Sequence, residues 1–325
     1  MEQVKRRPWR RWVVLVLMIV GFVLGGIFVP VRPEITAAPE ALILDPLFTL
    51  PVIGKFYLVN TLPTLAVTVL ILIPLLAYAT NRSLKKSAQT DLVPRGIGNL
   101  MESLLEVIYN MTEGAAGKWV KVIFPWFATI MIYVLIANLL KLIPGFESIG
   151  VLHPAHGEGH HATPLFGNWS LFTQEEGEYT LAPFFRGISV DLNFTAALAL
   201  IAVVAIQVVG FRAQGFSYLT KFFNVGNVFR KPVFGVIDLF MGLLELVSEF
   251  SKILSFAFRL FGNMFAGIVL VAVVSSLLGK ISIVPAMIFM FELFVGVIQA
   301  FVFGILTMVF MVMATQGHGE EHAKQ

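Results

Sequence analysis

Six apolar segments, separated by polar stretches, dominate the pattern of this chain. They cover residues 12–29, 57–79, 122–143, 190–211, 232–278 and 285–314. A helix needs about 20 predominantly apolar residues to cross the hydrocarbon core of a bilayer. The pattern therefore predicts an all-α polytopic membrane protein with about six membrane segments, without an internal repeat or a separate soluble domain.

The last two segments are longer than an upright span requires. A continuous helix over residues 232–278 is about 70 Å long and one over residues 285–314 about 45 Å, whereas the hydrocarbon core is about 30 Å thick. Both helices must therefore be bent, broken or steeply tilted. Because only the short stretch "GKISIVP" separates them, we expect a tilted helical hairpin over residues 232–314.

The N-terminal segment has two interpretations. Five basic residues precede the apolar run at 12–29, which is typical of both a secretory signal peptide and a membrane anchor. The run is about as long as a spanning helix needs, and "VRPEITAAPE" after it is a weak cleavage signal, so we favour a retained signal-anchor. We divide the chain into this anchor with an external linker, residues 1–56, and a membrane domain, residues 57–325.

Charge indicates the topology. Basic residues cluster at residues 5–11, 82–86 and 212–231, as expected of cytoplasmic flanks. The connection at 144–188 contains five glutamates and only one Lys or Arg, Arg186, so we place it outside. Both termini are then expected in the cytoplasm. The amphipathic stretch 97–108 predicts a cytoplasmic helix at the membrane surface.

Composition supports the membrane class. Of 325 residues, 57% are hydrophobic and 13% charged, against about 25% charged in soluble domains. The net charge of +3 is too small to indicate nucleic acid, and the absence of Cys removes disulfides and thiolate metal sites. Four histidines and Glu158 at residues 153–161 have a spacing that suits a metal. We favour a solvated loop, and expect neither a metal nor a cofactor.

A polar stripe surrounds one arginine, Arg259, within the segment at 232–278. A charge at the bilayer centre costs about 3 kcal/mol or more, and Arg does not lose its proton there. An arginine at this position therefore indicates a functional role. Steps of three and four place a set of polar residues on its helix face: Glu245, Ser248, Lys252, Ser255 and Asn263. Gly262 and Ala266 keep this side thin, so another helix can approach closely.

The last segment has its own stripe, made of Glu292, Gly296 and Gln299. In an antiparallel hairpin Gln299 can lie beside Arg259, with Glu292 about 10 Å further toward the outside. The segment at 190–211 begins with Asp191 and Asn193 at its external end. Polar side chains therefore extend from both sides of the membrane to its middle, and Arg259 lies where the two sets of polar side chains meet.

Each of these residues also has a structural interpretation. Arg259 can be neutralised by Glu292 or Glu245, although intramembrane charges usually serve a function. Glu245 can simply lie at the interface, and the amide side chains of the two stripes can hold helices together. Asp191 can cap its helix, and this alternative and a role in an ion pathway remain equally open.

The stretch "LELVSEFSKILSFAFRLFGNMFAG" resembles the signature helix of subunit a of the F-type ATP synthases, and "IQAFVFGILTMVFM" resembles its partner helix. "ISVDLNFTAALAL" and "ANLLKLIPGFES" also fit, and the resemblance covers residues 61–318. It implies a non-catalytic stator subunit whose two offset proton half-channels reach the carboxylates of a rotating c-subunit ring. Proton movement would thereby be coupled to ring rotation and ATP synthesis.

The resemblance also implies roles for residues. Arg259 matches the essential arginine of the family, and Asn263, Gln299 and Glu245 match polar residues of its ion path. Glu292 lies where the family often has His or Glu. Ile268 departs from the family, which often has Glu or His there, so we favour Glu292 for the external half-channel.

The implied partners are the c-subunit ring, b-type peripheral stalk subunits, the remaining ATP synthase subunits and membrane lipid, in a bacterial plasma (inner) membrane. We favour protons over sodium as the transported ion. Two other classes compete. A secondary transporter predicts repeated halves, which the sequence lacks. A passive channel or assembly scaffold predicts that Lys can replace Arg259.

Overall fold

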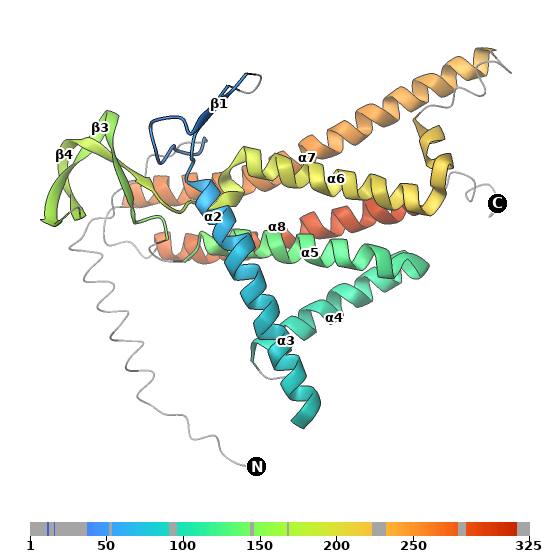
Figure 1. The fold of residues 1–325 in the computed structure, drawn as a ribbon, viewed down its shortest axis with the longest axis horizontal. Helices are drawn as coiled ribbons and strands as arrows, with labels where there is room; N and C mark the ends of the chain where they lie inside the picture. Colours follow the sequence, from blue (N-terminus) through green and yellow to red (C-terminus); the bar gives the residue numbers. More distant parts are fainter. Residues whose placement is uncertain are drawn as a thin grey trace.

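The structure, a computed structural model, describes residues 12, 16, 38–51, 54–90, 96–143, 146–167, 169–222, 232–278 and 284–316. Helices dominate this part of the chain (Figure 1). Five helices in it are long and apolar enough to cross a membrane: Thr61–Lys85, Ile97–Leu140, Leu192–Lys221, Phe240–Val274 and Met287–Thr315. The all-α polytopic class is confirmed. The expected N-terminal anchor at 12–29 lies outside the described residues, except for Trp12 and Val16.

The first described span is a single long helix with one irregular turn. It consists of α2 (Thr61–Val67), the π-helical turn η1 (Thr68–Leu72) and α3 (Ile73–Thr90). Pro74 follows the π-helical turn. A proline inside a helix removes one hydrogen bond and clashes with the preceding turn, and a wider turn accommodates this local defect. The helix therefore continues past Pro74.

Two consecutive helices form the next part of the chain. The amphipathic α4 (Ile97–Ala116) extends the expected surface helix at 97–108 by two turns. Gly117, with φ +51°, then redirects the chain, and the 3-10 turn η2 (Gly117–Trp119) leads into α5 (Val120–Leu140). Glycine suits this corner because a positive φ is strained for other residues.

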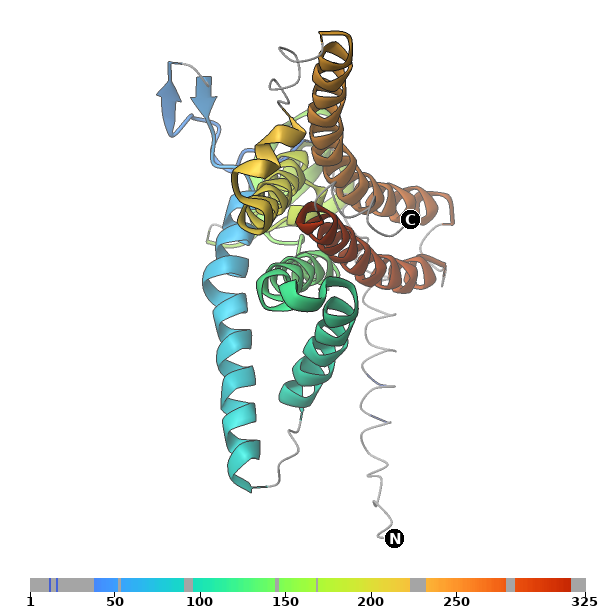
Figure 2. The ribbon, with the colours of Figure 1, turned by 90° about the vertical axis from the view of Figure 1, so that its right-hand side faces the viewer.

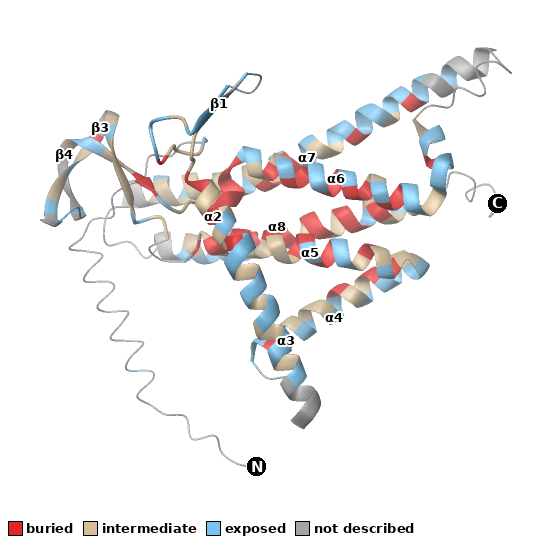
Figure 3. Ribbon diagram, viewed as in Figure 1, coloured by how far each residue is buried: buried red, intermediate tan, exposed pale blue. Residues whose placement is uncertain are grey.

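The core lies between four helices: α5, α6 (Leu192–Gln214), α7 (Pro232–Leu278) and α8 (Val284–Thr315). Helix α8 contacts each of the other three, and buried residues concentrate where they meet (Figure 3). The largest fully buried side chains include Phe127, Ile206, Phe256, Leu260, Phe303 and Met311. Helices α5 and α6 are apolar on most sides, as expected of helices enclosed by others or by lipid.

Helices α7 and α8 are unbroken over 47 and 32 residues. In Figure 1 they run in opposite directions, and α7 separates from the other helices toward its N-terminal end. Figure 2 shows that α7 changes direction along its length. Helix α7 thus accommodates its length of about 70 Å without a break.

The connection between α5 and α6 differs from the loop expected at 144–188. It contains an antiparallel hairpin of β3 (Gly150–Phe166) and β4 (Trp169–Pro183). A smaller hairpin, of β1 (Phe48–Leu50) and β2 (Gly54–Phe56), lies before the first described span. Four irregularities interrupt the β3–β4 register. Its Gly, Pro and His residues hide the two-residue alternation by which a strand is recognised. Among the described residues, no group of three His, Asp or Glu side chains is placed to hold a metal.

Candidate functional site

Arg259 lies on the side of α7 that turns away from the core. Its neighbours Phe256 and Leu260 are buried, and the Phe256 ring lies 5.0 Å from that of Phe303 on α8. This packing fixes the rotation of α7 and leaves Arg259 half-buried. Its Nη2 donates to Ser255 Oγ, one turn earlier, at 3.4 Å. Among the described carboxylates, none forms an ion pair with Arg259.

One turn further along α7, a hydrogen bond joins the two stripes of the hairpin. Asn263 Nδ2 donates to Gln299 Oε1 at 2.7 Å. Gln299 is buried, and none of the described residues forms a hydrogen bond with its Nε2. On the same helix, Gly296 O accepts a hydrogen bond from Asn138 Nδ2 of α5 at 3.0 Å. Three helices are therefore joined by polar contacts beside Arg259.

Glu292 lies two turns before Gln299 and is nearly buried. A side chain at Gly267 of α7 would collide with its Oε1, which has no hydrogen-bond partner in the described part of the chain. Its Oε2 lies 3.6 Å from Lys141 Nζ, and the two side chains are only 8% and 3% exposed. These residues and Asn263 line one cavity of about 260 Å³. The alternative that Glu292 neutralises Arg259 is wrong, since the partner of Glu292 is Lys141.

Lys141 follows the last residue of α5 and was not expected in the site. Its Nζ also donates to Met264 O at 3.3 Å. The sequence held one signal: Lys141 is a basic residue at the end of a span that charge predicts to be external, where the positive-inside rule does not predict a lysine.

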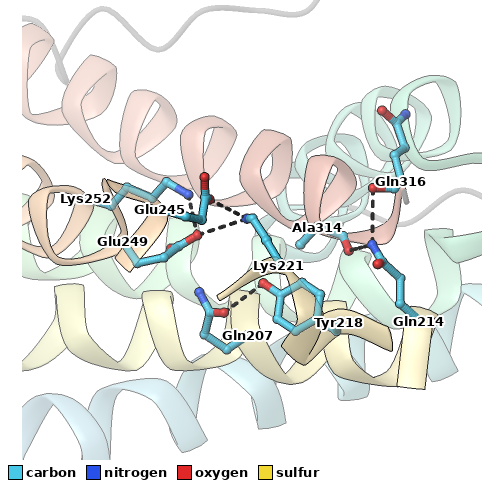
Figure 4. A network of polar contacts seen from close by, with 9 residues as sticks. All are labelled: Gln207, Gln214, Tyr218, Lys221, Glu245, Glu249, Lys252, Ala314 and Gln316. Carbon is cyan, nitrogen blue, oxygen red and sulfur yellow. Dashed lines mark hydrogen bonds and ion pairs between the residues drawn. The ribbon is translucent and has the colours of Figure 1, made fainter. Parts of the chain in front are cut away.

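At the other end of the hairpin, Glu245 belongs to an ion-pair network (Figure 4). Lys221 Nζ lies 2.6 Å from Glu245 Oε1 and 3.4 Å from Glu249 Oε1, and Lys252 Nζ lies 2.8 Å from the same Glu249 oxygen. Lys221 comes from η4 (Gly215–Lys221), the turn that ends α6. The partner of Glu245 is thus Lys221 and not Arg259. Sequence reasoning missed Lys221 and Glu249.

Asp191 caps helix α6. Its Oδ1 accepts a hydrogen bond from the Asn193 backbone N–H at 2.9 Å, and its Oδ2 accepts one from Thr61 Oγ1 at 2.8 Å. The capping interpretation is therefore confirmed, and the same carboxylate ties α2 to α6. Asp191 and the exposed Asn193 line a second cavity, of about 470 Å³, which is separate from that of Glu292.

The fold and these sites define a class: an integral membrane protein in which polar and charged groups lie between long apolar helices. Comparison with known proteins gives the family. The family model described as ATP synthase A chain matches residues 62–312. The chain therefore belongs to the ATP synthase subunit a family. It is a non-catalytic component of the membrane sector, which works in ATP synthesis and ion transport in a complex with other ATP synthase subunits.

Individual relatives agree. The chain is 32% identical to ATP synthase subunit a of Helicobacter pylori (strain Shi470) over 245 residues, which are 73% of this chain and 85% of the relative. It is 30% identical to ATP synthase subunit a of Trichlorobacter lovleyi over 254 residues, 78% of this chain and 85% of the relative. It is also 30% identical to the sodium ion specific ATP synthase subunit a of Propionigenium modestum, over 69% of this chain and 65% of the relative.

Proposed function

We propose that this chain is the stator subunit that provides two offset proton half-channels to the c-subunit ring and couples proton translocation to ring rotation. One observation carries the proposal. Arg259 is a permanent cation on an apolar helix, yet no described carboxylate of the chain pairs with it. A charge in this setting requires a counter-charge, and the ring carboxylates of the partner supply it.

The coupling follows from electrostatics. A ring carboxylate that faces lipid must be protonated, because the bare charge is too costly there. Beside Arg259 the ionised form is stabilised by the opposite charge. The same guanidinium repels a proton that moves directly from one half-channel to the other. Each proton that crosses the membrane yields about 2.3 kcal/mol per 100 mV, which drives rotation.

In this proposal the outer half-channel contains Glu292, Gln299 and Asn263. Their shared position between α7 and α8 supports this assignment, as does the cavity that Glu292 and Asn263 line. Asp191 and Asn193 lie further out and act at its entrance, where Asp191 also caps α6 by accepting a hydrogen bond from the Asn193 N–H. In this proposal the transported ion is a proton. A carboxylate such as that of Glu292 can bind and release a proton.

Glu245 belongs to the inner half-channel. It is fourteen residues before Arg259, which is about 21 Å along the helix, and it is half-exposed. Its carboxylate forms an ion pair with Lys221, which follows α6. The further partners in the proposal are b-type peripheral stalk subunits. The complex lies in a bacterial plasma membrane, with both termini of this chain in the cytoplasm.

The test uses Arg259→Ala and Arg259→Lys in the whole complex, reconstituted in liposomes. We expect both variants to assemble and to lose ATP-driven proton pumping, because an ammonium cannot reproduce the fork of a guanidinium. A scaffold with a static counter-ion tolerates Lys. Normal pumping by Arg259→Lys would therefore refute the coupling role and favour the scaffold.

A further inference from the structure

The contact between Lys141 and Glu292 is the least expected polar feature of the structure. Nζ of Lys141 lies 3.6 Å from Oε2 of Glu292, and both side chains are almost fully buried. The two residues come from different helices and are joined across the bundle. Nζ is held on a second side by Met264 O of α7. The Lys141 ammonium therefore connects the end of α5 to both helices of the hairpin, α7 and α8.

The two carboxylate oxygens of Glu292 have different surroundings. Oε2 faces the ammonium, whereas Oε1 is buried against Gly267 and has no hydrogen-bond partner among the described residues. The cavity of about 260 Å³ is lined by Glu292 and also by Asn263. Its wall is mostly apolar, and its polar side chains are those of Lys141, Asn263 and Glu292; a cavity of this size has room for several water molecules. The carboxyl group that Lys141 holds therefore lies at the wall of this cavity.

The surroundings explain why the ammonium stays in place. The β-carbon position of Gly187 would lie 2.9 Å from Lys141 Cβ, so the Gly187 backbone packs directly on the lysine stem. Gly187 N–H in turn donates to Glu147 Oε1 at 3.0 Å, which places a second carboxylate near the lysine. The charged groups around Glu292 in the described residues are therefore Lys141 and Glu147.

We propose that Lys141 is a positioning residue of the outer half-channel: it holds Glu292 by Oε2 and so keeps the carboxyl group at the cavity that Gly267 and Asn263 also line. The inference rests on the proposed function, since it assigns Lys141 to the same proton path. Lys141 does not itself carry the proton. A buried ion pair adds little to stability over an apolar pair, but loss of one partner leaves an uncompensated charge.

The experiment measures ATP-driven proton pumping by the reconstituted complex over a range of pH, after assembly has been quantified. We expect Lys141→Gln to lower pumping about tenfold, a size typical of coupling between contacting charged groups, and to alter its pH dependence. In the Glu292→Gln background the same substitution should change neither quantity. The exchanged pair, Lys141→Glu with Glu292→Lys, should not pump, because the carboxylate then lies at the end of α5 and no longer on α8.

Two controls separate positioning from folding. Lys141→Arg keeps the charge and should retain most of the pumping. Lys121→Gln removes an exposed lysine at the other end of α5 and should leave pumping unchanged. Wild-type pumping by Lys141→Gln would overturn the proposal, as would an equal loss in the Glu292→Gln background. Failure of both Lys141→Gln and the double variant to assemble would assign Lys141 to folding and also overturn it. In each case Arg259→Ala still reports separately on the proposed function.

Discussion

Gly267 lies opposite Glu292 in the hairpin, and an alanine at this position tests how closely the two helices must approach. A β-carbon at 267 would collide with Glu292 Oε1. The obstructing atom is the far end of a flexible side chain. We therefore expect the Gly267→Ala variant to turn the carboxylate away from the cavity and to leave α7 and α8 in place.

The effect on stability should be small because two terms oppose each other. Alanine is better than glycine inside a helix by about 1 kcal/mol, whereas overpacking destabilises by about 1–3 kcal/mol. The net change should stay below about 2 kcal/mol, within the range of ordinary substitutions. The displaced carboxylate loses its approach of 3.6 Å to Lys141. Pumping should then fall about tenfold, as for other coupled charged contacts.

The assay is ATP-driven acidification of liposomes, with the amount of assembled complex measured first. Gly114→Ala is the matched control, since a β-carbon there meets no atom within 4 Å; it should pump normally. Glu292→Asp, which is shorter by one methylene, should restore part of the pumping in the Gly267→Ala variant. Normal pumping by Gly267→Ala alone would refute the reasoning, and so would a loss that Glu292→Asp leaves unchanged.

Three further predictions concern access, topology and stability. Cysteine at position 292 should react with silver ion supplied from outside and cysteine at 245 with silver ion from inside, and the opposite pattern would exchange the half-channels. Gln3→Cys and His322→Cys should both resist an impermeant maleimide added outside; labelling of either contradicts the cytoplasmic termini. Asp191→Ala should lower the thermal stability of the complex by about 1–2 kcal/mol through loss of the α6 cap, whereas an unchanged melting temperature would show that the cap is dispensable.

The central part of the site could be predicted from the sequence because helical periodicity is rigid. Steps of three and four residues fix which side chains share a face, and an antiparallel hairpin fixes their order. This reasoning placed Gln299 beside Arg259, and the structure shows its hydrogen bond one turn further along α7, at Asn263. It also placed Glu292 further along the same face. The length of α7 was predictable for a different reason, because the apolar run over residues 232–278 is long.

The ion pairs could not be predicted in this way. Lys141 and Glu292 lie on α5 and α8, and Lys221 meets Glu245 only because η4 folds back beside α7. Such contacts depend on how helices pack, and periodicity within one helix carries no information about them. The β3–β4 hairpin was missed for another reason. Its pairing is irregular, so no strand alternation was present to detect.

Distance and pairing together explain why no described carboxylate contacts Arg259. Glu245 lies on the same helix but about 21 Å away along its axis, and Glu292 lies on the partner helix α8, two turns before Gln299. Lys141 and Lys221 contact these carboxylates instead, and a paired carboxylate attracts a second cation less strongly. In the proposed function, the guanidinium is therefore available to the carboxylates of the ring. A stator that binds and releases each passing ring carboxylate, as we propose, needs this arrangement, since an internal ion pair at Arg259 would compete with every one of them.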